Sequence, residues 1–199
     1  MAELAALPQC ILTPRLSLRL LTPDDAQAVF EAKQESWDDF WRWGIWTFNP
    51  KEKATLADDE KWCQHLYDRM QRGEKFNFLA FERVGNTLVG QGMLAPDAHE
   101  PGHYTIGYWV RSSQTGRGYG SEIATALCHF ALGALGASQL SSFHAAGNIG
   151  SQRVLEKTGF VQTKVLPAQH EIKTTGLVVD EIHYTLPVPE RLPKIDVSW

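Results

Sequence analysis

The spacing of hydrophobic positions changes several times along the chain, and each spacing predicts a different kind of element. Leu16, Leu18 and Leu20 alternate with polar residues, which indicates a strand with one buried face. The alternation returns over 104–110, and other segments typical of strands cover 76–81, 87–94, 139–145, 161–166 and 177–186. Apolar residues near helical spacing predict helices over 26–36, 54–72 and 122–135, with a shorter helix after Asn148.

These elements form one continuous series, because no repeat, linker or low-complexity block interrupts them. The sequence therefore predicts a single mixed α/β domain over 1–199, with a core of about 15–186. Gly85-Asn86 predicts a tight hairpin between two of the strands. Three prolines in 187–199 exclude a regular helix or a central strand there, so this segment is predicted to be a tail.

A glycine-rich turn joins the strand over 104–110 to the helix over 122–135. Gly116, Gly118 and Gly120 allow backbone conformations that other residues avoid, and they let a ligand approach the main-chain amides. The first N–H groups of the following helix have no partners within it, and they lie at the positive end of its dipole. With the charge of Arg117 nearby, the turn is predicted to bind an anion such as a phosphate group.

Two common nucleotide-binding loops do not fit this turn. A Walker loop needs a lysine before its Ser/Thr, but Ser121 follows a glycine. A dinucleotide fingerprint needs its third glycine one place later, and it needs an acidic residue at the end of the next strand. The segment 139–145 contains no Asp or Glu, so a nucleotide-binding protein is disfavoured.

Composition and charge narrow the function further. The formal net charge of −4 argues against nucleic acid as the main partner, since phosphate backbones favour basic proteins. Three widely spaced cysteines give neither a disulfide framework nor a zinc motif, so we expect reduced thiols and no metal site. No apolar run approaches the length of a membrane span, and the first residues lack a basic leader region. A cytoplasmic protein without membrane association is expected.

Two motifs resemble the GNAT superfamily of N-acetyltransferases. The acetyl-CoA loop of that family has the pattern Gln/Arg-x-x-Gly-x-Gly/Ala, which Gly118 and Gly120 match while Thr115 occupies the Gln/Arg position. The segment 148–160 resembles the Asn-x-x-Ser-x-x-(aliphatic)-x-x-Lys-x-Gly-Phe pattern that follows the fifth strand in the family. The resemblance spans roughly 15–186. It implies a twisted, mixed and mostly antiparallel sheet of about seven strands, flanked by helices and splayed between strands 4 and 5.

The resemblance also implies acetyl-CoA as the cosubstrate, without a metal. The main chain of Trp109 and Val110 would pair with the pantetheine arm, and the glycine turn would take the pyrophosphate. The cofactor-binding residues expected on this basis are Trp109, Val110, Thr115, Gly116, Arg117, Gly118, Tyr119, Gly120, Ser121, Asn148 and Ser151.

Acetyl transfer to an amine requires a base for the amine and a proton donor for the departing thiolate. Many relatives supply the donor as a tyrosine at the position of Leu155, whereas Rim-type relatives have a serine at the position of Ser151. Ser151 is therefore the candidate acid, although a serine in a first helical turn also serves as a cap. His103 and His144 are the candidate bases, since imidazole accepts protons near neutrality. A chain of water molecules is the alternative.

Aromatic residues crowd the stretch 37–48, which predicts either core packing or a substrate wall. In the Rim-type branch, which modifies the amino termini of ribosomal proteins, a similar Trp-rich segment lies beside the acceptor site. By this resemblance, Trp41 and Trp43 are expected to line the acceptor pocket.

The leading hypothesis is acetyl transfer from acetyl-CoA to a primary amine, with a protein amino terminus as the favoured acceptor. A polyamine, an amino acid or an aminoglycoside is the alternative acceptor. A non-catalytic acyl-CoA-binding module is a further alternative, because Thr115 and Leu155 depart from the family pattern. Homodimers are common among relatives, but no residue of this sequence specifies one.

Overall fold

A single mixed sheet organises the protein. The computed structural model describes residues 8, 10–43, 51–187 and 189–199. Eight strands in these ranges form one sheet with the order β1-β2-β3-β4-β5-β6-β8-β7. They are β1 (Cys10–Leu12), β2 (Leu16–Leu20), β3 (Phe76–Glu82), β4 (Leu88–Pro96), β5 (His103–Val110), β6 (Gln139–Ala145), β7 (Val161–Ile172) and β8 (Leu177–Leu186). Among these strands only β5 and β6 pair in parallel, which confirms the mixed, mostly antiparallel sheet with one strand more than expected.

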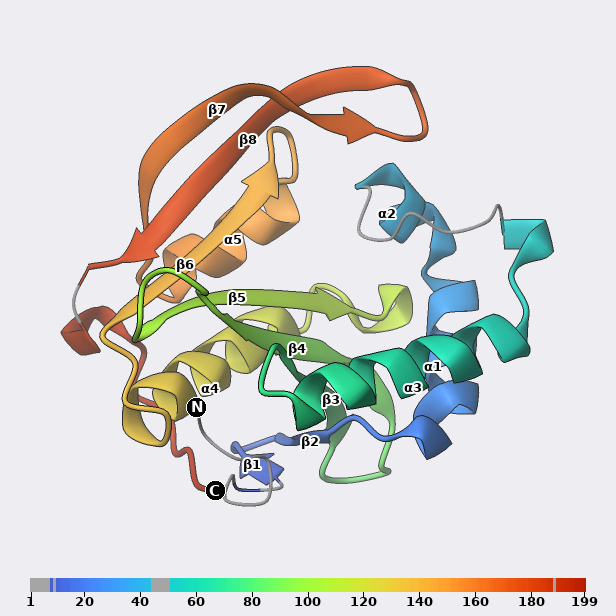
Figure 1. Cartoon of the computed structure of the whole chain (residues 1–199), viewed down its shortest axis with the longest axis horizontal. Helices are drawn as coiled ribbons and strands as arrows, with labels where there is room; N and C mark the ends of the chain where they lie inside the picture. The colour runs from blue at the N-terminus through green and yellow to red at the C-terminus, as the bar shows by residue number, and fades with distance from the viewer. Residues whose placement is uncertain (1–7, 9, 44–50, 188) are drawn as a thin grey trace.

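Helices cover both faces of the sheet (Figure 1). The α-helices of the described residues are α1 (Ala26–Glu35), α2 (Trp37–Arg42), α3 (Leu56–Gln71), α4 (Tyr119–Gly133) and α5 (Ile149–Lys157). Helices α1 and α3 pack together on one face, and α4 packs against β4 and β5 on the other. None of the described helices is both long enough and apolar enough to cross a membrane.

Strand alternation decides which side chains face which helices. Phe78 of β3 meets Phe130 of α4, with the two ring centroids 5.5 Å apart. On β4, a Cβ atom added to Gly92 would meet Leu127 of α4 at 2.8 Å, so Gly92 also faces α4. Neighbouring positions on a strand point to opposite faces, and Gln91 therefore faces the side covered by α1 and α3.

Several element ends lie where local sequence signals predict them. Asn148 caps α5, because its Oδ1 accepts the N–H of Ser151 at 3.1 Å. Gly159 follows the end of α5 with φ of 92°, the left-handed conformation that glycine favours. The hairpin residues Gly85 and Asn86 both have positive φ, 89° and 52°. The cap at Asn148, the glycine after α5 and the place of the hairpin are confirmed, but residues 83–87 connect β3 to β4, so the predicted two-residue turn between Val84 and Thr87 is wrong.

Three segments differ from the pattern-based expectation or add to it. Part of the aromatic stretch forms the short helix α2, and β7 extends six residues beyond the predicted end at 166. In the segment predicted to be a tail, Pro189 begins a 3₁₀ turn, Pro189–Arg191. Leu192 is buried, and Ser198 pairs with Leu12 of β1.

The sheet opens where β5 and β6 part. Their pairing covers only His103–Thr105 on β5 with Gln139–Ser141 on β6. Beyond these residues β6 leans away from β5 together with β8 and β7, and α2 lies across the opening from the β7–β8 hairpin (Figure 1). This is the splay that the resemblance implies, and it creates the space for a site.

Candidate functional site

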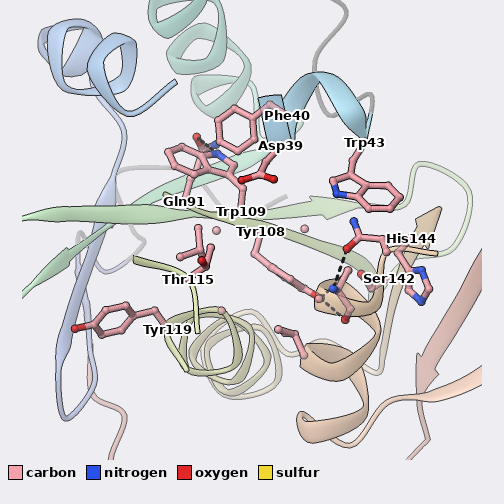
Figure 2. Close-up of a pocket in the computed structure, with 18 of the residues that line it drawn as sticks. Asp39, Phe40, Trp43, Gln91, Tyr108, Trp109, Thr115, Tyr119, Ser142 and His144 are labelled. Atoms are coloured by element: carbon pink, nitrogen blue, oxygen red, sulfur yellow. Dashed lines mark hydrogen bonds between the residues drawn. The ribbon is translucent and has the colours of Figure 1, made fainter. Parts of the chain in front are cut away.

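One cavity of about 990 Å³ occupies the opening between β5 and β6. On β5 it is lined by 107–110, and on β6 by 142–145. We call the part bounded by the glycine turn, α4 and α5 the loop side, and the part bounded by α2, α3, β3 and β4 the aromatic side. Figure 2 shows side chains of both parts, with Thr115 and Tyr119 on the loop side and Phe40 and Trp43 on the aromatic side. The cavity therefore joins the two faces of the sheet.

The loop side is built around the start of α4. Gly118 is the N-cap of α4 with φ of 83°, a conformation that L-residues with a side chain rarely adopt. The N–H groups of the first turn, from Tyr119 onward, have no carbonyl partner within the helix. Because these donors face a cavity at the positive end of the dipole, the loop side can bind an anion.

Most of the residues that the sequence assigns to the cofactor line this cavity. They are Trp109, Val110, Thr115, Gly116, Gly118, Tyr119, Gly120, Ser121, Asn148 and Ser151. Arg117 is exposed and does not line the cavity, and its main-chain carbonyl accepts a hydrogen bond from Arg15 at 2.9 Å. Two further cations on α5, Arg153 and Lys157, line the cavity and were not singled out from the sequence.

A network from the β1–β2 turn holds the glycine turn in place. Glu122 of α4 accepts hydrogen bonds from Thr13 Oγ1 at 2.6 Å and from Arg15 Nε at 2.7 Å. The Arg15 guanidinium also lies 4.5 Å from the ring centroid of Tyr119, whose hydroxyl donates to Glu82. Since these partners are far apart in the sequence, local patterns give no sign of the network.

The structure brings a tyrosine to Ser151 that the sequence analysis did not consider. The Tyr108 hydroxyl of β5 lies 3.1 Å from Ser151 Oγ and 3.2 Å from the Ser151 carbonyl oxygen (Figure 2). Burial raises the pKa of Tyr108 well above its ordinary range, and the hydrogen bond to Ser151 only partly opposes this. Tyr108 therefore stays protonated at neutral pH and can donate a proton or a hydrogen bond.

The two candidate histidines lie in different surroundings. His144 lines the cavity and is buried; its Nδ1 lies 2.9 Å from the Ala145 carbonyl oxygen and its Nε2 lies 3.2 Å from the Tyr184 hydroxyl. Because a carbonyl only accepts, Nδ1 carries a proton and Nε2 is the nitrogen that can take one. His103 does not line the cavity and instead bonds Glu100 at 3.0 Å and Ser141 at 2.9 Å.

The aromatic side contains one of the two predicted tryptophans. Trp43 lines the cavity, and its carbonyl accepts a hydrogen bond from His170 of β7 at 2.7 Å. Trp41 is not among the lining residues and stacks on Trp37, with the ring centroids 6.4 Å apart. Phe40, Trp62 and Leu66 complete the apolar wall. Trp46 and Phe48 of the aromatic stretch lie outside the described residues.

Helices α1 and α2 are tied directly to the segment that follows β5. The Glu35 carboxylate accepts hydrogen bonds from Arg111 Nε at 2.6 Å and from the main-chain N–H of Ser113 at 2.9 Å. The Asp39 carboxylate accepts a hydrogen bond from Ser112 Oγ at 2.5 Å. The aromatic side and the start of the glycine turn therefore share one set of polar contacts.

A row of polar side chains on β4, on β3 and directly before β3 was also missed. Lys75, Asn77 and Gln91 line the aromatic side, and Trp109 Nε1 donates to Gln91 Oε1 at 3.2 Å. A sequence signal existed, because Asn77 and Gln91 are polar residues inside strands that are otherwise apolar. Among the described residues, no group of three or more His, Cys, Asp or Glu side chains could hold a metal ion.

Comparisons with known proteins agree with this geometry. The family model "Acetyltransferase (GNAT) domain" matches residues 15–161. The "Probable N-acetyltransferase YjcK" of Bacillus subtilis (strain 168) is 23% identical over 164 residues, which cover 82% of this chain and 88% of that protein.

Two solved structures show the same fold. A putative ribosomal-protein-serine acetyltransferase from Vibrio cholerae superposes with a TM-score of 0.72 at 24% identity, covering 92% of this chain and 97% of the other. RimJ of Mycobacterium smegmatis, solved in complex with CoA-disulfide, superposes with a TM-score of 0.80 at 21% identity. The match covers 94% of this chain and 88% of the RimJ chain.

Proposed function

Because the chain belongs to the acetyltransferase (GNAT) domain family, we propose that it transfers acetyl from acetyl-CoA to a primary amine, favouring a protein amino terminus. One observation carries the proposal: a single cavity passes between β5 and β6 and connects an anion-binding helix start to an aromatic wall. The first suits the phosphates of CoA, and the second suits the acceptor. The CoA complex of the structural neighbour RimJ supports the same ligand here.

The exposed edge of β5 would hold the pantetheine arm. Among the described strands, none pairs with this edge beyond its three residues bonded to β6. Arg111 donates its N–H to Val89 of β4 at 2.8 Å, so strand alternation turns the main-chain groups of Tyr108 and Val110 toward the opening. A pantetheine arm can pair with them as a strand would. This replaces the expected pairing with Trp109 and Val110, because the main-chain oxygen of Trp109 faces Gly90 of β4 while its side chain contributes to the wall.

The phosphates would lie at the start of α4. The N–H groups from Tyr119 to Ser121 supply donors, and Arg153 and Lys157 of α5 add positive charge on the same side. The hydroxyl of Thr115, which replaces the usual Gln/Arg, donates to the Ser112 carbonyl at 2.9 Å and stabilises the turn.

The proposed reaction forms a C–N bond and breaks the C–S bond of the thioester. The amine loses a proton, and the departing thiolate gains one. A main-chain N–H on the β5 edge stabilises the negative charge that develops on the carbonyl oxygen. Ser151, hydrogen-bonded to the protonated Tyr108, is the proposed donor to the sulfur.

His144 is the better placed of the two candidate bases. It lines the cavity, and its Nε2 can accept a proton through the Tyr184 hydroxyl. His103 bridges Glu100 and Ser141 at the edge where β5 and β6 still pair, so we propose an anchoring role for His103.

A protein amino terminus is favoured as the acceptor for two reasons. The structural neighbours include proteins named as ribosomal-protein acetyltransferases. The aromatic side is also roomy and bounded by Trp43, Trp62 and His170, which suits an extended peptide more than a small amine.

The proposal is tested by measuring CoA-thiol release from acetyl-CoA with a panel of acceptors. The panel contains short peptides that differ in their first residue, together with polyamines, amino acids and aminoglycosides. Turnover confined to the peptides is the expected result, and turnover confined to a small amine would replace the favoured acceptor. Binding of acetyl-CoA without turnover on any acceptor would contradict catalysis and favour a binding module.

A further inference from the structure

The polar row on the floor of the aromatic side presents more hydrogen-bond donors than the described residues provide acceptors for. Lys75 immediately precedes β3, Asn77 lies two residues later, and Gln91 is on β4; all three line the cavity. The alternation of strand side chains places Lys75 and Asn77 on the same face of the sheet. This row is separate from the residues that we assign to CoA or to proton transfer.

Lys75 is a half-buried cation that has no anionic partner in the part of the chain that the structure describes. Within the described ranges no residue forms an ion pair or a hydrogen bond with its ammonium group, and Glu74 instead bonds Arg69 at 3.1 Å and Arg72 at 2.5 Å. Burial lowers the pKa of Lys75, and the nearby charge of Arg69 lowers it further. An ammonium group in this position is stabilised when a ligand brings a negative charge.

Asn77 adds a second unmatched donor beside Lys75. The indole N–H of Trp109 can only donate, so Gln91 must turn its Oε1 toward Trp109 and its Nε2 toward Asn77. Gln91 Nε2 donates to Asn77 Oδ1 at 2.9 Å, which leaves Asn77 Nδ2 facing away from Gln91. This buried nitrogen has no hydrogen-bond partner among the described residues. Asn77 and Lys75 therefore present two donors on one face that no described residue pairs with.

The remaining charge in the cavity does not supply an acceptor for these donors. Asp39 is the one acidic residue among the described lining residues, and it lies on α2 with its carboxylate bonded to Ser112. The floor of the aromatic side is therefore positive and rich in donors, whereas the molecule as a whole has a net charge of −4.

We propose that Lys75 and Asn77 form a carboxylate subsite, so that the preferred acceptor is a primary amine that also carries a carboxylate group. This inference rests on the proposed acetyltransferase function. Strand β3 lies two strands from β5, a separation of about 10 Å, so the carboxylate and the reacting amine are far apart in the ligand. An acidic side chain in the second or third residue of a peptide meets this requirement.

The test uses matched peptides that differ only in Asp or Asn at the second or third residue, together with glutamate and glutamine as small amines. For the unmodified protein we expect kcat/KM to be roughly tenfold higher for the Asp peptide than for the Asn peptide. This ratio of the two kcat/KM values should fall as salt is added, because salt screens the attraction between the charges. Lys75→Gln should bring the ratio close to one, Lys75→Arg should keep it, and Lys75→Glu should lower it below one, because a carboxylate at residue 75 repels the Asp peptide. Lys194→Gln, at an exposed lysine that does not line the cavity, is the matched control and should leave the ratio unchanged.

The outcomes separate this inference from the proposed function. Turnover with equal rates for Asp and Asn peptides, or an Asp preference that survives in Lys75→Gln, overturns the carboxylate subsite alone. A Lys75-dependent preference for glutamate over glutamine supports carboxylate binding by Lys75 but overturns the separation of about 10 Å, because only a few bonds join the amine of glutamate to its side-chain carboxylate. Absence of turnover with every acceptor overturns the proposed function and the subsite together, and thermal unfolding of each variant shows that the fold is intact.

Discussion

Tyr108 and Ser151 are 43 positions apart in the sequence, yet their hydroxyl oxygens lie 3.1 Å apart in the cavity. Each side chain has an ordinary explanation alone, since tyrosine is common in strands and serine in a first helical turn. Together they form a pair in which the partly buried Tyr108 stays protonated and holds a hydrogen bond with Ser151. A residue that acts through such a contact is recognisable only when its partner is known.

We predict that Tyr108→Phe and Ser151→Ala each lower kcat by roughly tenfold, because each removes one hydrogen bond from the proposed donor to the thiolate. The double variant should fall little further, since the two groups act as one unit. Steady-state kinetics with acetyl-CoA and the best acceptor provide the measurement. Tyr104→Phe, on the same strand but outside the cavity lining, is the control and should keep kcat. Full kcat in both single variants would remove the pair from the mechanism.

At the scale of elements, the turn into α1 shows how one side chain connects a strand to a helix. Asp25 is buried and accepts two hydrogen bonds from Arg19 of β2, at 2.8 and 2.5 Å. The same carboxylate accepts the N–H of Thr22 at 2.8 Å. Burial raises the pKa of Asp25, but these hydrogen bonds and the charge of Arg19 outweigh it, and the net shift is downward.

We predict that Asp25→Asn lowers the free energy of unfolding by about 2 kcal/mol at pH 7, because the charge-assisted bonds to Arg19 are lost. The folded-state pKa of Asp25 lies below its ordinary value of 3.8, so its contribution is complete above that pH and disappears as the pH falls through the folded-state value. The gap between the two proteins should therefore be constant from pH 5 to 8 and shrink below about pH 4.

Urea denaturation at pH 7 and at pH 3 measures this gap. Asp24→Asn changes the neighbouring, exposed carboxylate in the same way and should have little effect at either pH. An equal loss of stability at both pH values would show that the ion pair is not its source.

At the scale of the whole molecule, the C-terminal segment returns to the opposite end of the sheet from the cavity (Figure 1). Ser198 exchanges main-chain hydrogen bonds with Leu12 of β1 at 2.7 and 3.1 Å. The ring of Trp199 packs edge-on against Phe130 of α4, with centroids 5.7 Å apart, and covers Gly133. This segment closes the core next to β1, whereas Trp43 bounds the cavity at the other end.

We predict that replacing tryptophan by alanine lowers stability at one of these ends and weakens acceptor binding at the other. Trp199→Ala should lower the free energy of unfolding by about 1–2 kcal/mol without changing KM, because a half-exposed ring leaves the core surface. Trp43→Ala should raise the acceptor KM and affect stability less. Chemical denaturation and acceptor titrations on both variants provide the test, and a raised KM in Trp199→Ala would contradict the separation.

Much of the fold is predictable from the sequence because it rests on local physics. The two-residue period over Leu16–Leu20, the paired positive φ values at Gly85 and Asn86 and the cap at Asn148 involve residues at most a few positions apart. The glycine turn likewise identifies an anion-binding helix start from spacing alone. Strand β1 escaped prediction because three residues are too few to establish a period.

Most of the site depends instead on contacts that only packing can bring together. The sequence by itself determined the order of elements, the glycine turn and the resemblance to the family. The tertiary structure decided that Tyr108 meets Ser151 and that His144 lines the cavity while His103 does not. It also placed Lys75 in the cavity beside an Asn77 nitrogen that has no partner among the described residues. The physical reason is that backbone preferences and periodicity act over a few residues, whereas these pairs are set by sheet register and by the angle at which β6 leaves β5.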